Sequence, residues 1–306
     1  MKEEVLLSLC IPTNGVIEWV IPVLESIYSD KPNMELFEVV ITDNGNNSVF
    51  EAKMHEYERT YSNLVYKKTD AVMFYNQIEA FKLARGKLIK FINHRMIVLS
   101  GTIDYLIKFV QENIEVQPVV YFSNGELHLS PIQKKCDTFN EFVRTLSYWS
   151  SWSAGTAIWK KDFEKMDLNK NFNSLFPHTD IVFFNRKSKK YIVDDSILVR
   201  ELPTDSSKKG TYDLFYAFAV EYLSVIKELC LDGDISYNTY KYVKKKNSYF
   251  VSGLYLDYII KKKPCSYNLD GYNSAASVYY SDLEIRVKAA IIAIKSMGYK
   301  LKQVLK

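Results

Sequence analysis

Short apolar runs alternate with longer stretches of helical periodicity through the first part of the chain. The runs that predict strands cover residues 5–11, 36–42, 64–67 and 88–93. The stretches that predict helices cover residues 17–28, 48–61, 74–84 and 100–113. Strands that alternate with helices indicate βα units, so we expect a largely parallel sheet flanked by helices.

The pattern then becomes less regular and finally turns helical. Short β runs at residues 119–122, 126–129, 156–159 and 191–199, with a helix near 139–148, predict a mixed extension of the sheet. A polar segment over residues 203–210 interrupts the pattern, and helical periodicity follows over 212–231, 237–262 and 282–306. We therefore expect an α/β domain over residues 1–202 and a helical region over 203–306.

The last of these helices has the clearest pattern. Ser281 and Glu284 have the spacing of a capping box at its start. An apolar stripe and a row of lysines follow at helical spacing: Leu283, Val287, Ile291, Ile294, Leu301 and Leu305, beside Lys288, Lys295, Lys302 and Lys306. Because amphipathic helices usually pack on a core, we favour that interpretation. The alternatives are a helix lying on anionic lipid headgroups and a contact in a homo-oligomer.

Composition narrows the class of protein. A chain of 306 residues with 47% apolar and 25% charged residues suits a soluble globular protein and excludes intrinsic disorder. The four cysteines are far apart and form no Cys-x-x-Cys pair, which fits a reducing compartment. No signal-peptide pattern and no long apolar run is present. We therefore expect a cytoplasmic protein, attached at most peripherally to the inner face of the membrane.

The charge is distributed unevenly. Residues 241–306 contain 13 Lys and Arg against 4 Asp and Glu, whereas the whole chain has a net charge of only +4. A mildly acidic body therefore precedes a basic helical region, which we expect to meet an anionic surface.

Several common catalytic motifs are absent from the sequence. It contains no Gly-x-Gly-x-x-Gly, no Gly-x-x-x-x-Gly-Lys-Ser/Thr, no His-Glu-x-x-His and no Gly-x-Ser-x-Gly. Their absence disfavours dinucleotide enzymes, P-loop enzymes, zincins and ordinary serine hydrolases. A nucleotidyltransferase is disfavoured because no glycine-rich loop follows the first strand. Since no nucleic-acid-binding motif accompanies the aromatic residues, we expect no nucleic acid partner.

Polar residues follow the first two predicted strands. Pro12, Thr13 and Asn14 end the first strand, and Asp43 and Asn44 end the second. In an open parallel sheet, ligands bind beyond the carboxyl ends of the strands, so these residues could together hold one small molecule. Each segment alone is also ordinary turn chemistry.

Together with later segments, these residues resemble the bacterial family 2-like inverting glycosyltransferases of surface polysaccharide and capsule synthesis, which have the GT-A fold. The resemblance covers roughly residues 5–200, and its segments, in order, are residues 7–14, 39–45, 76–86 and 88–95. It implies a Rossmann-like, mostly parallel mixed sheet flanked by helices. It also implies a nucleotide-sugar donor, a glycan or lipid-linked glycan acceptor, and transfer with inversion.

The resemblance also assigns a donor site. The positions that match the family's nucleotide contacts are Pro12, Thr13, Asn14, Asp43, Asn44 and Asn76. The family's Asp-x-Asp, which binds Mg²⁺ or Mn²⁺ on the diphosphate, aligns with Asn93, His94 and Arg95. Hard divalent cations prefer carboxylate oxygens, whereas a guanidinium binds phosphate directly. We therefore expect no metal cofactor, and we place these three residues near the diphosphate.

The family's carboxylate general base matches Asp180, with the pair Asp194 and Asp195 as the runner-up. Without the resemblance, Asp180 is equally well explained as a first-turn carboxylate of a helix.

The acceptor site has weaker candidates. Trp149 and Trp152 could pack on sugar rings, and His178 lies near Asp180 in the sequence, although such residues are more often structural. The alternative function is a non-catalytic nucleotide- or glycan-binding protein that has kept the fold, because a fold alone does not establish an activity.

Overall fold

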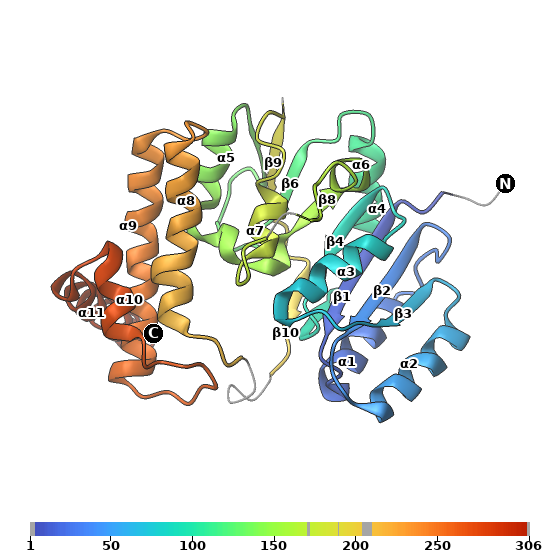
Figure 1. Cartoon of the computed structure of the whole chain (residues 1–306), viewed down its shortest axis with the longest axis horizontal. Helices are drawn as coiled ribbons and strands as arrows, with labels where there is room; N and C mark the ends of the chain where they lie inside the picture. The colour runs from blue at the N-terminus through green and yellow to red at the C-terminus, as the bar shows by residue number, and fades with distance from the viewer. Residues whose placement is uncertain (1–3, 170–171, 189, 204–209, 305–306) are drawn as a thin grey trace. The chain divides into compact units, whose positions relative to one another are not determined.

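The computed structural model describes residues 4–169, 172–188, 190–203 and 210–304, with residues 298–304 described by their backbone alone. The chain divides into two compact units, residues 1–203 and 204–306. Within the described residues, every strand belongs to the first unit, and the second is helical (Figure 1). The predicted fold class, an α/β domain followed by a helical region, is confirmed.

A five-stranded sheet forms the centre of the first unit, in the order β3-β2-β1-β4-β8. Its strands are β1 (Leu7–Thr13), β2 (Phe37–Asp43), β3 (Leu64–Lys68), β4 (Leu88–Phe91) and β8 (Ala157–Trp159). The first four run parallel, and β8 pairs with β4 in the antiparallel sense. In the register of β1 and β2, Thr13 lies beside Asp43. The polar residues that end these two strands therefore share one edge of the sheet.

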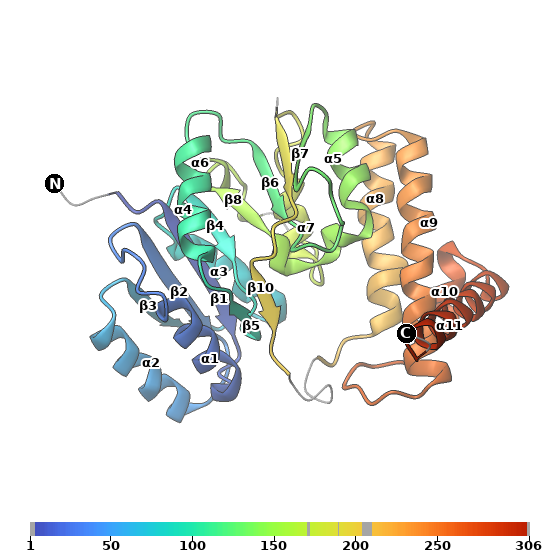
Figure 2. The same cartoon turned by 180° about the vertical axis from the view of Figure 1, so that it is seen from behind.

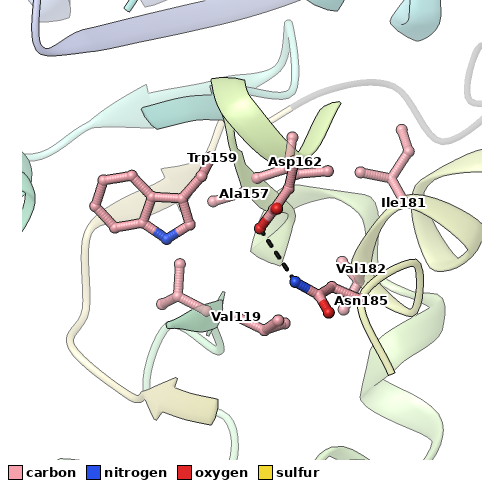
Figure 3. A pocket seen from close by; sticks show the side chains of 9 residues that line it. Val119, Ala157, Trp159, Asp162, Ile181, Val182 and Asn185 are labelled. Atoms are coloured by element: carbon pink, nitrogen blue, oxygen red, sulfur yellow. Dashed lines mark hydrogen bonds between the residues drawn. The ribbon is translucent and has the colours of Figure 1, made fainter. Parts of the chain in front are cut away.

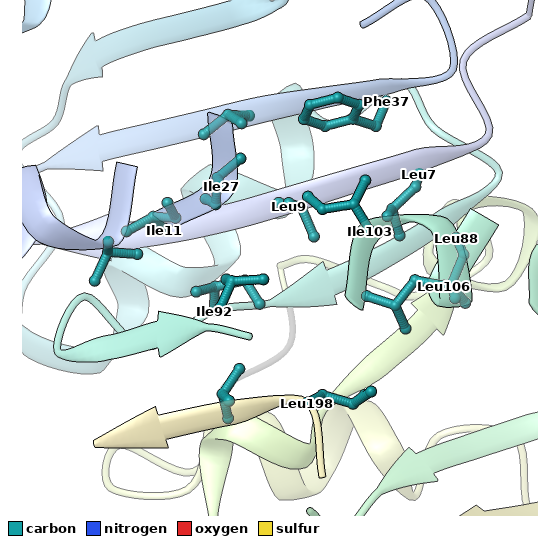
Figure 4. Packing of buried hydrophobic residues seen from close by; sticks show 14 of the residues in the cluster. Leu7, Leu9, Ile11, Ile27, Phe37, Leu88, Ile92, Ile103, Leu106 and Leu198 are labelled. Carbon is teal, nitrogen blue, oxygen red and sulfur yellow. The ribbon is translucent and has the colours of Figure 1, made fainter. Parts of the chain in front are cut away.

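Alternate residues of each strand point to the same face of this sheet. On one face they form a buried apolar cluster with helices. In Figure 4, Leu7, Leu9 and Ile11 of β1 lie in the same apolar cluster as Ile103 and Leu106. The helices that contribute to this cluster are α1 (Ile17–Tyr28), α2 (Ser48–Thr60) and α4 (Thr102–Asn113), and Figure 2 shows α1 and α4 in front of the strands.

The opposite face is covered by a second apolar cluster. Cys10 and Ile89 point to this side, where they pack with Ile78 and Ile181. The helices on this side are α3 (Asn76–Leu83), α6 (Lys160–Phe163) and α7 (Pro177–Val182). Helix α7, which carries Asp180, thus belongs to the same face of the sheet as α3.

Two smaller sheets and one helix complete the first unit. One sheet pairs β10 (Val199–Glu201) with β5 (Met96–Val98), and the other has the order β6 (Val119–Phe122), β9 (Tyr191–Asp194), β7 (Gln133–Cys136). Helix α5 is Phe139–Leu146. The sequence analysis gave no bounds for β5, β7, α6 and α7, each of which has six residues or fewer.

The predicted strand over residues 126–129 is wrong. The backbone amides of Leu127 and Leu129 donate to the carboxylate of Asp195, at 3.2 and 2.8 Å, instead of joining a strand ladder. His128, between them, has a positive φ of 51°. A long-range carboxylate thus turns an apolar segment into a loop.

The predicted strand over residues 191–199 is two strands in different sheets. The carboxylate of Asp194 accepts a hydrogen bond from the Ser196 amide at 3.0 Å, and this local turn ends β9. The chain then enters β10 at Val199.

The second unit consists of helices, two of which are continuous with π-helical segments. Its α-helices are α8 (Tyr222–Leu231), α9 (Tyr237–Leu254), α10 (Tyr272–Tyr279) and α11 (Asp282–Val304), and its π-helical segments are Tyr216–Glu221 and Tyr255–Ile260. The prediction missed α10 and treated each π-helical segment as ordinary helix. Most of the polar segment 203–210, residues 204–209, lies outside the described residues.

Helix α11 packs on the helical unit, but not through the predicted apolar stripe. The Ser281 hydroxyl accepts the Glu284 amide at 3.1 Å, so the N-terminal cap is present. The face that packs on the unit, however, contains Ile285 and Ala289, whereas Leu283 is 72% exposed. The predicted members Leu305 and Lys306, and the side chains of Leu301 and Lys302, lie outside the described residues.

Candidate active site

The turns that follow β1 and β2 fit against each other. The Asn44 amide donates to the Thr13 carbonyl at 3.1 Å. Gly45 lies so close to Asn14 that a Cβ at position 45 would overlap the Asn14 carbonyl oxygen. Gly15 has a φ of +78°, a left-handed conformation that glycine adopts at little cost. The two polar segments that the sequence singles out therefore form one continuous edge after Pro12.

Asn76, at the start of α3, joins the ends of the two strands. Its Nδ2 donates to the carbonyls of Thr13 and Thr42, at 3.1 and 2.9 Å, and its Oδ1 accepts from the Thr69 hydroxyl at 2.8 Å. The residue is buried. Asn76 thus holds the edge in shape, and its predicted contact with a nucleotide stays a prediction.

Asp43 is fully buried and fixed in orientation. Its Oδ1 accepts from the Gly45 amide at 2.7 Å, and its Oδ2 accepts from the Tyr66 hydroxyl at 2.9 Å and from Lys68 Nζ at 3.2 Å. Burial, followed by the hydrogen bond to Asp43, raises the pKa of Tyr66 well above its usual range. Asn44 extends the same surface, because its Nδ2 donates to the Ala71 carbonyl at 2.8 Å.

Arg95 lies in the turn between β4 and β5. Its guanidinium covers the indole of Trp19, with Cζ 5.3 Å from the ring centroid. The Nε and Nη1 atoms are buried and have no hydrogen-bond partner among the described residues. A buried donor without an acceptor costs free energy, so an acceptor that reached these atoms would stabilise the arrangement. Arg95 therefore offers two donors and a positive charge to an anionic group.

His94 connects Arg95 to β1. Its Nδ1 lies 2.9 Å from the Thr13 hydroxyl, and its ring packs edge-on against Trp19 with centroids 5.0 Å apart. Burial, and secondly the charge of Arg95, lowers the pKa of His94 to about 3, so the imidazole is neutral near pH 7. The Asn93 side chain accepts the Arg95 amide at 3.0 Å and shapes the turn. The structure thus brings Thr13, His94 and Arg95 together.

The residues at this edge supply few ligands for a divalent cation, and the predicted independence of a metal stays a prediction. The carboxylate of Asp43 already accepts three hydrogen bonds, and Arg95 adds a positive charge. In the part of the chain that the structure describes, no group of three or more His, Cys, Asp or Glu residues could hold a metal ion. Mg²⁺ and Mn²⁺ prefer several hard oxygen ligands, which residues 93–95 do not supply.

Trp149 lies in the 3₁₀ turn Ser147–Ser151, Trp152 lies between this turn and the next one, Ser153–Gly155, and the two tryptophans form a second group before β8. Their rings are nearly perpendicular, at 83°, with centroids 6.2 Å apart. The Tyr121 hydroxyl lies 2.5 and 2.8 Å from the carbonyl oxygens of the two tryptophans. Gly155 leaves room for the Tyr121 ring, which a Cβ at that position would overlap. The backbone beneath both indoles is therefore fixed by one tyrosine.

His178 links α7 to this group. Its Nε2 lies 2.8 Å from the Ser151 carbonyl, which can only accept, so Nε2 carries the proton. The Thr179 hydroxyl donates to the Ser150 carbonyl at 2.9 Å. His178 is buried, and its hydrogen bond to the Ser151 carbonyl joins α7 to the segment that contains the two tryptophans. Its predicted role in acceptor binding stays a prediction.

Asp180 is partly exposed on α7. Its Oδ2 accepts the Asn173 amide at 2.6 Å. The Tyr75 hydroxyl donates to the Phe172 carbonyl at 2.7 Å, which holds the segment before α7 near Asn76 and the start of α3. Helix α7, which carries Asp180, is thus tied to the tryptophan segment through His178 and Thr179, and the segment that precedes it is tied to the start of α3 through Tyr75.

The runner-up carboxylates have structural partners. Asp194 accepts from the Tyr105 hydroxyl at 2.6 Å and from Gln133 at 2.8 Å, and Asp195 accepts from the Ser123 hydroxyl at 2.5 Å. Both are buried. They hold the β6-β9-β7 sheet together.

His178 makes a testable contribution to stability. Burial lowers its pKa to about 4, against about 6.5 for an exposed histidine. Between these values the unfolded chain binds more protons, so stability rises with pH and is lost as the pH falls from about 6.5 toward 4. In His178→Gln, which keeps a donor for Ser151, we expect this slope to fall by about 1.4 kcal/mol per pH unit.

The measurement is urea unfolding at several pH values across this window. The control is His128→Gln, since His128 is exposed. An unchanged slope in His178→Gln would show that the histidine is not kept neutral by burial.

The sequence analysis did not identify Trp19 as part of the site. It stands on α1, 8% exposed, and contacts both His94 and Arg95. A small cavity elsewhere is lined by Trp159, Asp162 and Asn185, with Asp162 and Asn185 hydrogen-bonded at 3.3 Å (Figure 3). None of the predicted site residues lines it, so it is a gap in packing and not the proposed site.

Solved structures that are similar to this chain include glycosyltransferases. S. aureus TarS 1–349 in complex with UDP-GlcNAc is 14% identical over 83% of this chain and 73% of that chain, with a TM-score of 0.54. Mannosyltransferase PcManGT from Pyrobaculum calidifontis, in complex with GDP-Man and Mn²⁺, is 12% identical over 94% of this chain and 87% of that chain, with a TM-score of 0.53. The fold is that of GT-A glycosyltransferases.

Sequence comparisons add no closer relationship. No protein-family profile matches the chain, and neither does any curated protein sequence. Among the described residues, no helix has both the length and the apolar character needed to cross a membrane.

Proposed function

We propose that this chain is a glycosyltransferase that moves a sugar from a nucleotide-sugar donor to a hydroxyl of a glycan or lipid-linked glycan. The observation that carries the proposal is the guanidinium of Arg95, whose Nε and Nη1 lack partners among the described residues. It stands at the carboxyl edge of a GT-A sheet, where such folds bind ligands. A diphosphate supplies the acceptor oxygens and negative charge that these two nitrogens require.

The proposed reaction is a single displacement. The acceptor hydroxyl oxygen attacks the anomeric carbon, the bond from that carbon to the diphosphate oxygen breaks, and the configuration inverts. Asp180 takes the hydroxyl proton as general base. Arg95 stabilises the charge that develops on the departing diphosphate. Trp149 and Trp152 would contact the acceptor.

Surface polysaccharide synthesis, including capsule, is the role that we propose for this transfer. A second candidate is a non-catalytic protein that binds a nucleotide or glycan. It is favoured by Asn93 and Arg95, which occupy the two positions that are carboxylates in the family that the sequence resembles. Turnover distinguishes the transferase from a nucleotide-binding protein, because both would bind the nucleotide.

The test combines binding and turnover. Thermal unfolding is measured with UDP-, GDP-, CDP- and dTDP-sugars, since a ligand of the folded state raises its unfolding temperature. Release of nucleoside diphosphate is then measured with the donor that binds. Stabilisation with release supports a transferase, and stabilisation without release with any acceptor supports a nucleotide-binding protein. Stabilisation by none of the donors contradicts both of these and leaves only a glycan-binding protein.

Metal dependence gives a separate prediction. If Arg95 neutralises the diphosphate, activity in excess EDTA should stay within about twofold of activity in Mn²⁺, because no step requires the cation. The measurement is nucleoside diphosphate release after extensive dialysis against EDTA. Complete loss of activity that Mn²⁺ restores would contradict metal-independent transfer.

A further inference from the structure

The exposed side of α11 is apolar along most of its described length. Leu283 is 72% exposed, Val287 49%, Ile294 64% and Met297 56%. At about 100° per residue these side chains, with Ala290 between them, fall within a narrow stripe. The opposite side packs through Ile285 and Ala289. We call the exposed set, residues 283, 287, 290, 294 and 297, the α11 stripe.

A basic side flanks the α11 stripe. Lys295 is exposed and lies about 120° round the helix from Leu283. Lys288 is on the same side, but its Nζ donates hydrogen bonds to the Glu284 carboxylate and the Ser248 hydroxyl, both at 2.5 Å. A stripe of apolar side chains beside lysines is the arrangement of helices that lie in a membrane interface.

The surrounding charge indicates what covers the stripe. Residues 241–306 contain 13 Lys and Arg against 4 Asp and Glu, and Lys245, Lys246 and residues 261–263 are exposed. A second copy of this region would bring an equally positive surface against the first, which like-charge repulsion opposes. An anionic bilayer complements the charge and accepts the apolar side chains.

We propose that the α11 stripe lies on a lipid bilayer that carries anionic headgroups. Leu283, Val287, Ile294 and Met297 enter the boundary between headgroups and acyl chains, and Lys295 contacts lipid phosphate. The inference does not depend on the proposed transfer, since it concerns α11 alone.

The test measures binding of the full chain to vesicles. Vesicles are made of phosphatidylcholine alone or of an equal mixture of phosphatidylcholine and phosphatidylglycerol, and the chain is sedimented with each. We expect the wild type to bind the mixture at least about tenfold more tightly. Leu283→Gln with Ile294→Gln should weaken binding about a hundredfold, and Lys295→Gln about fivefold.

The matched control is Leu231→Gln. Leu231 is 75% exposed in the same helical unit but lies on α8, outside the stripe, so vesicle binding should not change. Circular dichroism verifies that each variant is folded, and Lys295→Gln provides an independent readout should the double variant misfold. Equal binding to both vesicles, or equal binding of stripe and control variants, would overturn the proposal.

Light scattering tests whether a second copy of the chain, instead of a membrane, covers the α11 stripe. A wild type that is dimeric in solution, a double variant that is monomeric, and vesicle binding that is the same for both would assign the stripe to a second copy and overturn the membrane proposal.

Discussion

Replacing Arg95 with alanine should reduce sugar transfer by about 10²–10³-fold, the usual loss when a preorganised donor to a developing charge is removed. The two unpartnered nitrogens of Arg95 and its contact with Trp19 are the physical reason, because they fix a cation where the diphosphate would bind. Nucleoside diphosphate release measures the loss. Thermal unfolding with the donor should show a smaller shift than in the wild type.

Two further variants make this result specific. Arg95→Lys keeps the charge but loses the planar fork, so most of the activity should still be lost. Arg200→Ala removes an exposed arginine of β10 and should leave transfer unchanged. If Arg95→Ala is folded and transfers sugar at the rate of the Arg200→Ala control, the diphosphate is neutralised by another group.

Asp180→Asn should reduce transfer by about 10³-fold while donor binding is retained. A general base contributes roughly 10²–10⁴ to rate, and asparagine can still accept the Asn173 amide, so the fold should persist. The rate constant for transfer and the donor-induced shift in unfolding temperature are the two measurements. A lower rate at every acceptor concentration, with an unchanged shift, is the expected pattern.

The matched control is Asp167→Asn. Asp167 is an exposed aspartate whose Oδ1 accepts the Asn169 amide at 3.0 Å, so the same change is made in a comparable turn. Near-normal transfer by a folded Asp180→Asn protein would remove Asp180 as the base.

Local periodicity was sufficient to predict the central sheet and the longer helices. The apolar runs that became β1, β2 and β3 differ from the observed strands by at most two residues at either end, because buried parallel strands read as continuous apolar segments. The errors lie where a side chain distant in the sequence determines the local backbone structure. Asp195 draws the amides of Leu127 and Leu129 away from a strand, and no local pattern contains that information.

The helical unit shows a second limit of sequence patterns. The stripe of α11 was predicted to face the core because apolar side chains usually do so. The side that packs instead contains Ile285 and Ala289, and both sides of the helix contain apolar residues. Periodicity identifies an apolar side of a helix but cannot choose between two of them.

For the candidate site, sequence reasoning found the residues that end the strands. It did not find their hydrogen-bond partners or their contacts. It placed Thr13, His94 and Arg95 in one site, and the structure puts them in contact or in the same turn. It could not show that two guanidinium nitrogens of Arg95 lack partners, because that depends on every neighbour in space. Trp19 was missed for the same reason.

Asn76 has a consequence for how far such sequences can diverge. Both hydrogen bonds of its Nδ2 go to main-chain carbonyls, those of Thr13 and Thr42, which any residue at those positions would provide. The side chains around the edge can therefore be exchanged over evolutionary time without separating the two strand ends. Two homologous chains could thus keep the geometry of this edge after most of their residue identities have been lost.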